Sequence, residues 1–294
     1  MLNNSFIWLL SLLLFLVGVL LNNSIEIIFF FEMISIIAIP LMIVYSGVST
    51  HNNYTSLMVF FVVSSITSVF LIYSWAIELL SLFFFVLMFK FGLFPFCWWV
   101  YVVYSGVSTG ALIFLNTFFK SVLLAIGFIE GVDLVDGFFL FFFFNILFCL
   151  NNLLNTIEGW YSFIAGNSIV SSGLLLIFLT SLSNNEFIIY FFLSWLYISS
   201  IVYFVLNINL FNKDYSVFDI LSGACYLFIF LALPFSLVVI YKVYSVLLVL
   251  SSCGILLVFS WLCYNVIEQI WLLNVFFNSN EWSSLGEIYS SRLA

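Results

Sequence analysis

Long apolar runs, separated by short polar stretches, follow one another along almost the whole chain. A membrane-spanning helix needs about 20 mainly apolar residues, and runs of this kind predict about ten spans. The alternation of apolar and polar positions that marks membrane β-barrels is missing, so the pattern predicts an all-α polytopic membrane protein. The expected spans are 5–21, 25–45, 54–74, 77–97, 110–129, 137–150, 160–181, 186–207, 217–241 and 244–264.

Two of the expected spans contain a proline that interrupts the helix. Pro95 lies in 77–97, and Pro234 lies in 217–241. Proline removes a backbone donor and clashes with the carbonyl group one turn earlier, so we expect both spans to be broken helices. We assign 1–277 to a single transmembrane helical bundle and 278–294 to a polar carboxyl-terminal tail.

The composition supports the membrane assignment and narrows the chemistry. Of 294 residues, 66% are hydrophobic and 6% are charged, far from the averages of soluble domains. With only 5 basic residues, no nucleic acid partner is expected, whereas membrane lipids are. The chain has 1 histidine, 5 cysteines without a CxxC pair and no phosphate-binding glycine loop, so we expect no cofactor or metal in this chain itself.

Four ionisable residues fall well inside the apolar runs: Glu32, Lys90, Lys120 and, at the break of the ninth span, Lys242. A charged lysine at the centre of a membrane helix costs roughly 2.5 to 3.5 kcal/mol, so each is expected to face protein or water and to have a functional reason. The other intramembrane carboxylates lie nearer the ends of spans and are assigned to solvated helix termini: Glu78, Glu130, Glu186, Asp219 and Glu268.

Buried lysines with a carboxylate nearby can move protons. Burial favours the neutral form of the amine and a partner carboxylate favours the charged form, so a change in their spacing makes the lysine release or take a proton. The helices with Lys90 and Lys242 also carry the two prolines, and an odd number of spans separates them, so they should run in opposite directions. Interrupted helices at matching places in inverted halves point to an ion path near the midplane, and the pattern predicts an inverted repeat.

Four segments resemble one family of membrane proteins. Phe31-Glu32-Met33 with Ile39-Pro40-Leu41 is similar to the glutamate-containing helix of the antiporter-like subunits of respiratory complex I, in particular NADH-ubiquinone oxidoreductase chain 2. The stretch from Lys90 to Val100 resembles the family's K-x-G-x-x-P-F-H-x-W-V segment. Thr117 to Lys120 fits its T-x-x-K, and Leu233-Pro234 followed by Lys242 fits its L-P-x7-K.

The resemblance implies a role for each matching residue. Glu32 and Lys90 would form the pair that gates protonation, Lys120 would be the central relay lysine, and Lys242 would be the terminal one. Two family histidines are replaced, by Cys97 and by Ser171, which implies that serine hydroxyls and water serve the central path. The carboxyl end also looks one helix shorter than the family pattern.

The function implied by the resemblance is that of a core membrane-arm subunit of a proton-translocating NADH:ubiquinone oxidoreductase. The chain would conduct protons through the lysine and glutamate relay without redox chemistry of its own. NADH, FMN, iron-sulphur clusters and ubiquinone would bind to partner subunits, and the neighbours would include other antiporter-like chains. The expected location is the mitochondrial inner membrane. The bias toward Phe, Leu, Ile, Ser and Asn, together with the lack of a basic leader, indicates that the chain is encoded in the organelle.

Three alternatives stay open from the residues alone. The chain could be one of the two longer antiporter-like subunits of the same complex, although their flanking patterns differ. It could be a free-standing cation or proton secondary transporter. It could also be a subunit that holds the membrane arm together without conducting, an alternative that the replaced histidines allow.

Overall fold

The computed structural model describes residues 24–45, 51–107, 109–129, 138–154, 160–211, 236–252 and 254–277, and within them every regular element is a helix. Ten helices are described: α2 (Ser24–Tyr45), α3 (His51–Ala76), α4 (Leu80–Phe91), α5 (Trp98–Gly106), α6 (Thr109–Ile129), α7 (Phe138–Leu154), α8 (Trp160–Ser181), α9 (Asn184–Phe211), α11 (Leu237–Ser252) and α12 (Ile255–Phe277). The prediction of an all-helical chain is therefore confirmed for these residues.

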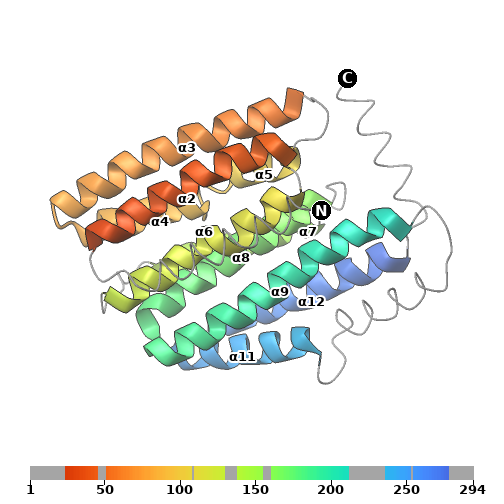
Figure 1. Cartoon of the computed structure of the whole chain (residues 1–294). Helices are drawn as coiled ribbons and strands as arrows, with labels where there is room; N and C mark the ends of the chain where they lie inside the picture. Colours follow the sequence, from red (N-terminus) through yellow and green to blue (C-terminus); the bar gives the residue numbers. More distant parts are fainter. Residues whose placement is uncertain are drawn as a thin grey trace.

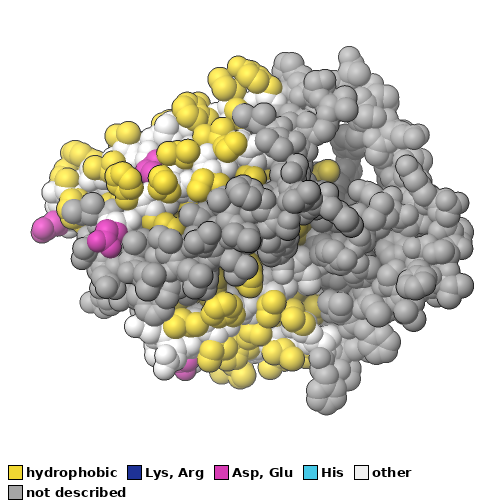
Figure 2. Space-filling view, in the orientation of Figure 1, with side chains coloured by type: hydrophobic (Ala, Val, Ile, Leu, Met, Phe, Trp, Pro, Cys, Tyr) yellow, Lys and Arg dark blue, Asp and Glu magenta, His cyan; other side chains and the backbone are white. Residues whose placement is uncertain are grey.

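Several helices have the length and apolarity of membrane spans. Four candidate spans lie in α3, α8, α9 and α12, and shorter apolar stretches lie in α2, α4, α6, α7 and α11. Figure 2 shows hydrophobic side chains spread over the described part of one face, with a few acidic groups among them and no lysine or arginine. These features agree with a multi-pass helical membrane protein, because apolar side chains on the outside need lipid or protein around them.

The helices lie side by side in a bundle with α8 at its centre (Figure 1). Helix α8 contacts α4, α5, α6, α7, α9 and α11, and 94% of its candidate span is buried. Helices α2 and α3 pack together on one side of the bundle, and α11 and α12 pack together on the other. The central helix is thus the element through which the two sides of the bundle meet.

The many serines fit these apolar helices because their hydroxyls bond within the helix. Ser64 donates to the Phe61 carbonyl at 2.9 Å, and Ser260 donates to the Leu257 carbonyl at 2.9 Å. Such bonds to the preceding turn satisfy a hydroxyl in a medium without water. A serine whose hydroxyl instead reaches another helix is therefore of special interest in this chain.

The chain leaves helical geometry between α4 and α5. Helix α4 ends at Phe91, Gly92 follows in the left-handed region with φ 64°, and Pro95 lies in the irregular segment before α5. The break begins at Gly92, ahead of the proline, and the helix α5 that follows was not among the expected spans. Side chains satisfy freed backbone groups here, as membrane burial demands. The Phe94 amide donates to Asn145 Oδ1 at 3.1 Å, and Trp99 Nε1 donates to the Phe89 carbonyl at 3.1 Å.

The expected spans 217–241 and 244–264 have the wrong boundaries. Helix α11 runs through Lys242 to Ser252, and α12 continues to Phe277. Lys242 therefore lies within a helix and not in a helix break. Apart from Lys242 the stretch 241–244 is apolar, and the connection lies instead at Gly254, between the two helices. The expected span 5–21, the break at Pro234 and the tail 278–294 lie outside the described residues, so the second broken helix stays a prediction.

Candidate functional site

Lys90 of α4 and Glu32 of α2 form a buried ion pair. The lysine Nζ lies 3.3 Å from Glu32 Oε1, and the side chains are 1% and 30% exposed, respectively. The Nζ also lies 4.5 Å from the centroid of the Phe31 ring, at a distance where a cation is attracted to an aromatic face. The lysine charge is therefore compensated inside the bundle, while the carboxylate retains a partly open side.

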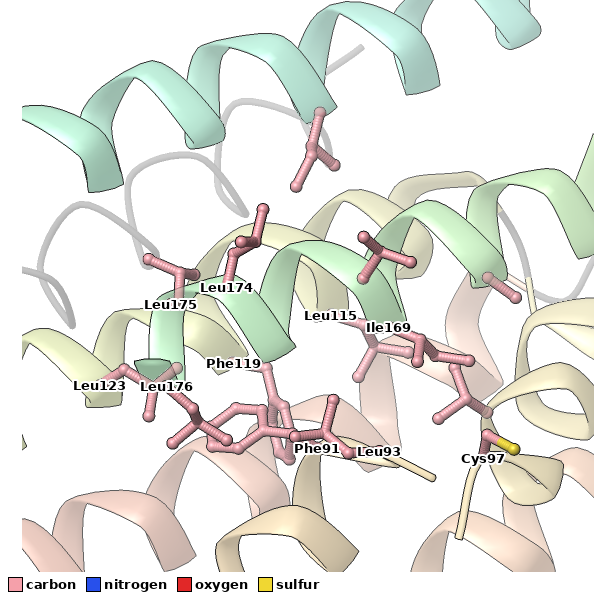
Figure 3. Packing of buried hydrophobic residues seen from close by; sticks show 14 of the residues in the cluster. Phe91, Leu93, Cys97, Leu115, Phe119, Leu123, Ile169, Leu174, Leu175 and Leu176 are labelled. Atoms are coloured by element: carbon pink, nitrogen blue, oxygen red, sulfur yellow. The ribbon is translucent and has the colours of Figure 1, made fainter. Parts of the chain in front are cut away.

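An aromatic cluster lies next to this pair. It consists of Phe31, Phe91 and Phe119, which are the chain neighbours of Glu32, Lys90 and Lys120. The ring centroids lie 6.0 Å apart for Phe31 and Phe91, 6.4 Å for Phe31 and Phe119, and 5.6 Å for Phe91 and Phe119. Figure 3 shows Phe91 and Phe119 together with Leu93 below α8.

The two lysines next to this cluster are not joined by polar contacts. Within the described part of the chain, no hydrogen bond or ion pair connects the Lys90 and Glu32 pair to Lys120. The three rings form an apolar region next to the Lys90 and Glu32 pair. Ions or protons cannot cross such a region by direct hydrogen-bond exchange.

Lys120 of α6 is bound by the central helix. Its Nζ donates to Ser171 Oγ at 2.5 Å and to the Ser168 carbonyl at 2.8 Å, both on α8. Among the described residues, no carboxylate lies within ion-pair distance of this lysine. Ser171 is the position at which the resemblance would place a histidine, and its hydroxyl provides the direct contact to the lysine.

A second hydroxyl network lies beside Lys120. The Tyr104 hydroxyl is 2.9 Å from Asn116 Oδ1 and 2.7 Å from Ser168 Oγ. The amide oxygen of Asn116 can only accept, so the tyrosine donates to it and is left to accept a hydrogen bond from the serine. This network ties α5, α6 and α8 together near the central lysine.

Lys242 of α11 forms the second buried ion pair, and its partner is Glu268 of α12. The Nζ lies 2.7 Å from Glu268 Oε2, and the side chains are 12% and 2% exposed. The assignment of Glu268 to a solvated helix terminus was therefore wrong. Because α12 continues well beyond 264, this carboxylate lies inside the bundle. Glu78 and Glu186, in contrast, are exposed near helix ends.

The other oxygen of Glu268 is held by two donors. Asn167 Nδ2 donates to Oε1 at 2.8 Å, and the Tyr197 hydroxyl donates to it at 2.5 Å. The hydroxyl of Tyr264 donates to Asn167 Oδ1, which fixes the orientation of the amide. Both oxygens of this buried carboxylate therefore have partners inside the bundle, and each donor replaces a lost water contact.

A small cavity lies between Ser171 and Glu268. It has room for about one water molecule, and its lining combines polar groups with aromatic rings. The residues around it are Asn167, Val170, Ser171, Tyr197, Ile198, Tyr241, Trp261, Tyr264 and Glu268. Ser171, which binds Lys120, and Glu268, which binds Lys242, therefore line one cavity.

The sequence indicated the lysines, Glu32 and, as a replaced histidine, Ser171, but not the role of Glu268 on α12 or its donors on α8 and α9. A signal was present in Asn167, Ser168 and Ser171, which recur at helical spacing in an otherwise apolar run. Another was Glu268 together with Asn265, which fall within one span if the last apolar run is extended to 277. Tyr197 had no comparable signal, since tyrosines are common along the chain.

The described site consists of charged, amide and hydroxyl groups. Among the described residues, no three His, Cys, Asp or Glu side chains lie close enough to hold a metal ion. No protein-family model matches the chain, and no curated protein sequence matches it either. The site contains two ion pairs inside the bundle, Lys90 with Glu32 and Lys242 with Glu268. Lys120 binds a hydroxyl and a carbonyl group of the central helix α8.

Proposed function

We propose that this chain is an antiporter-like membrane subunit of respiratory complex I, most similar to chain 2, and that it carries protons across the mitochondrial inner membrane. Electron transfer from NADH to ubiquinone would take place in partner subunits, which would hold the FMN and iron-sulphur clusters. The motifs around Glu32, Lys90, Lys120 and Lys242 support the family, together with the inverted repeat that the pattern predicts.

The proposal that the chain conducts protons is supported by one observation. Buried polar groups lead from Lys120 through Ser171 to the cavity, and from the cavity through Glu268 to Lys242. Buried polar groups are costly in a membrane protein and are typical of ion and proton pathways. A bundle needed only for packing would be more stable with apolar side chains at these positions.

The energies are compatible with this function. Moving one charge against 100 mV costs about 2.3 kcal/mol. A charged lysine at the centre of a membrane helix costs roughly 2.5 to 3.5 kcal/mol. Switching the partner of one buried lysine therefore involves a free energy of the size needed to move one proton.

A second candidate function is that of a subunit that holds the membrane arm together without conducting. The aromatic cluster of Phe31, Phe91 and Phe119 favours it, because these rings pack together next to Lys90 and no described polar contact joins Lys90 to Lys120. Under this alternative the ion pairs would only fix the packing of the helices. Both candidates place the chain in the same assembly and differ in whether protons pass through it.

Two measurements test the proposal. The tagged chain, extracted from its native membrane in mild detergent, should purify with proteins that carry FMN and iron-sulphur clusters, whereas a free-standing transporter would purify without them. In that assembly, Lys120→Ala should lower the number of protons moved per NADH oxidised. An unchanged number would favour the non-conducting subunit.

A further inference from the structure

Glu268 has a position that a simple counter-ion does not need. It contacts Lys242 through one oxygen, the other accepts from Asn167 and Tyr197, and the residue lines the cavity that Ser171 also lines. Ser171 is in turn the hydroxyl that binds Lys120. The carboxylate is thus the one described acidic group between the central lysine and Lys242.

We infer that Glu268 is a proton-carrying residue, which accepts a proton that comes from Lys120 through Ser171 and one water molecule and thereby releases a proton from Lys242. This inference rests on the proposed function, since it names a further group in the same path. It was not among the residues selected from the sequence or implied by the resemblance.

The steps balance in protons and charge. The Ser171 hydroxyl, which donates to the Asn167 and Ser168 carbonyls at 2.7 and 3.0 Å, first turns to a water in the cavity. The Lys120 ammonium then gives a proton to Ser171 Oγ while the serine gives its own to that water, and the water gives one to the Glu268 carboxylate. Lys120 is then a neutral amine and Glu268 a neutral acid. The Lys242 ammonium, now without its counter-ion, releases a proton away from the cavity. The Glu268 proton then moves to Lys242 Nζ, 2.7 Å from Oε2, and the ion pair is restored.

The surroundings of Glu268 allow both protonation states. Tyr197 and Asn167 donate to the charged form, and the tyrosine hydroxyl can rotate to accept from the neutral acid. Lys242 and Tyr241 of α11, Tyr197 of α9 and Tyr264 of α12 are the titratable groups around it. Of these, only Lys242 is a cation.

The first test compares proton movement in the assembled complex. Glu268→Gln keeps the size of the side chain, and Glu186→Gln is its control, since Glu186 is exposed near the start of α9. Glu268→Gln should lower the protons moved per NADH by the same amount as Lys120→Ala, and the double variant should show no further loss, because residues that act as a unit are not additive. Normal pumping by Glu268→Gln would overturn the inference and leave the proposed function standing.

The second test does not depend on pumping. Infrared difference spectra of the full chain in membranes, between acid and neutral pH, should contain a carboxyl band that is absent in Glu268→Gln and present in Glu186→Gln. If the band is unchanged in Glu268→Gln, the residue is a fixed counter-ion and the inference fails. If Lys120→Ala pumps normally, the proposed function fails, and this band still decides whether Glu268 exchanges a proton.

A third variant covers loss of folding. Glu268→Gln leaves Lys242 buried without its partner, which can prevent assembly. Lys242→Gln combined with Glu268→Gln removes both charges and should assemble. In that background the carboxyl band should be absent, whereas a band that persists would overturn the inference.

Discussion

Lys120 Nζ lies 2.5 Å from Ser171 Oγ, so a hydroxyl of α8, and no carboxylate of the described residues, holds the central lysine of α6. This contact joins the half of the bundle with Glu32 and Lys90 to the half with Glu268 and Lys242. The helix that provides it is the most buried of the candidate spans.

Ser171→Ala should destabilise the protein and impair proton movement, because it removes a direct partner of a buried amine. The expected loss in the free energy of unfolding is about 1 to 3 kcal/mol. Ser172→Ala is the matched control, since the Ser172 hydroxyl bonds only to the Ser168 and Ile169 carbonyls of its own helix, at 2.9 Å each. Equal losses in the two variants, measured by unfolding in lipid bilayers, would contradict a special role for Ser171.

The Lys242 and Glu268 pair should be strongly coupled in stability. Removing one member, by Lys242→Met or Glu268→Gln, leaves an uncompensated buried charge and should cost about 3 to 5 kcal/mol. The double variant should lose much less than the sum of the two single ones. A double-mutant cycle of unfolding free energies measures this, and additive losses would show that the two side chains do not interact.

Tyr197→Phe should weaken the binding of the Glu268 carboxylate. Loss of the hydroxyl at 2.5 Å removes one donor to a buried charge, which is worth about 1.5 to 3 kcal/mol. Tyr73→Phe on the exposed side of α3 is the control and should leave stability within about 0.5 kcal/mol. An unchanged melting temperature in Tyr197→Phe would mean that the carboxylate does not depend on this hydroxyl.

Gly92→Ala should disturb the break between α4 and α5. Gly92 has φ 64°, and a Cβ atom there would lie 2.1 Å from Val100 Cγ2. The left-handed backbone costs a residue with a side chain roughly 1 to 2 kcal/mol, and the overlap with Val100 adds about 1 to 3 kcal/mol.

Gly254→Ala is the control for that substitution, because nothing lies within 4 Å of the added Cβ and Gly254 is not in the left-handed region. The two variants should differ clearly in thermal stability in detergent. Equal stability would show that the segment from Gly92 to Val100 adapts without cost.

Much of the helical pattern could be predicted from apolar run length alone. The spans 25–45, 110–129 and 160–181 agree closely with α2, α6 and α8, because polar connectors separate them clearly. Run length failed near 241–244, where Lys242 is a charged residue inside a helix and does not mark its end. It also failed after 264, where Glu268 and Gln269 resemble the polar end of a span.

The site could be predicted only in part, for a related reason. A lysine in an apolar run is conspicuous, so Lys90, Lys120 and Lys242 were found. Their partners are polar side chains that become neighbours only when α6, α8, α9, α11 and α12 pack together. No spacing in the sequence shows that Asn167 Nδ2 and Glu268 Oε1, on different helices, lie 2.8 Å apart.

The most direct test of the account is the number of protons moved per NADH oxidised in sealed native membrane vesicles, compared for the wild type, Lys120→Ala and the exposed control Ser105→Ala. Fewer protons per NADH should be moved by Lys120→Ala, and Ser105→Ala should move as many as the wild type. An assembled complex with Lys120→Ala and an undiminished number would contradict it.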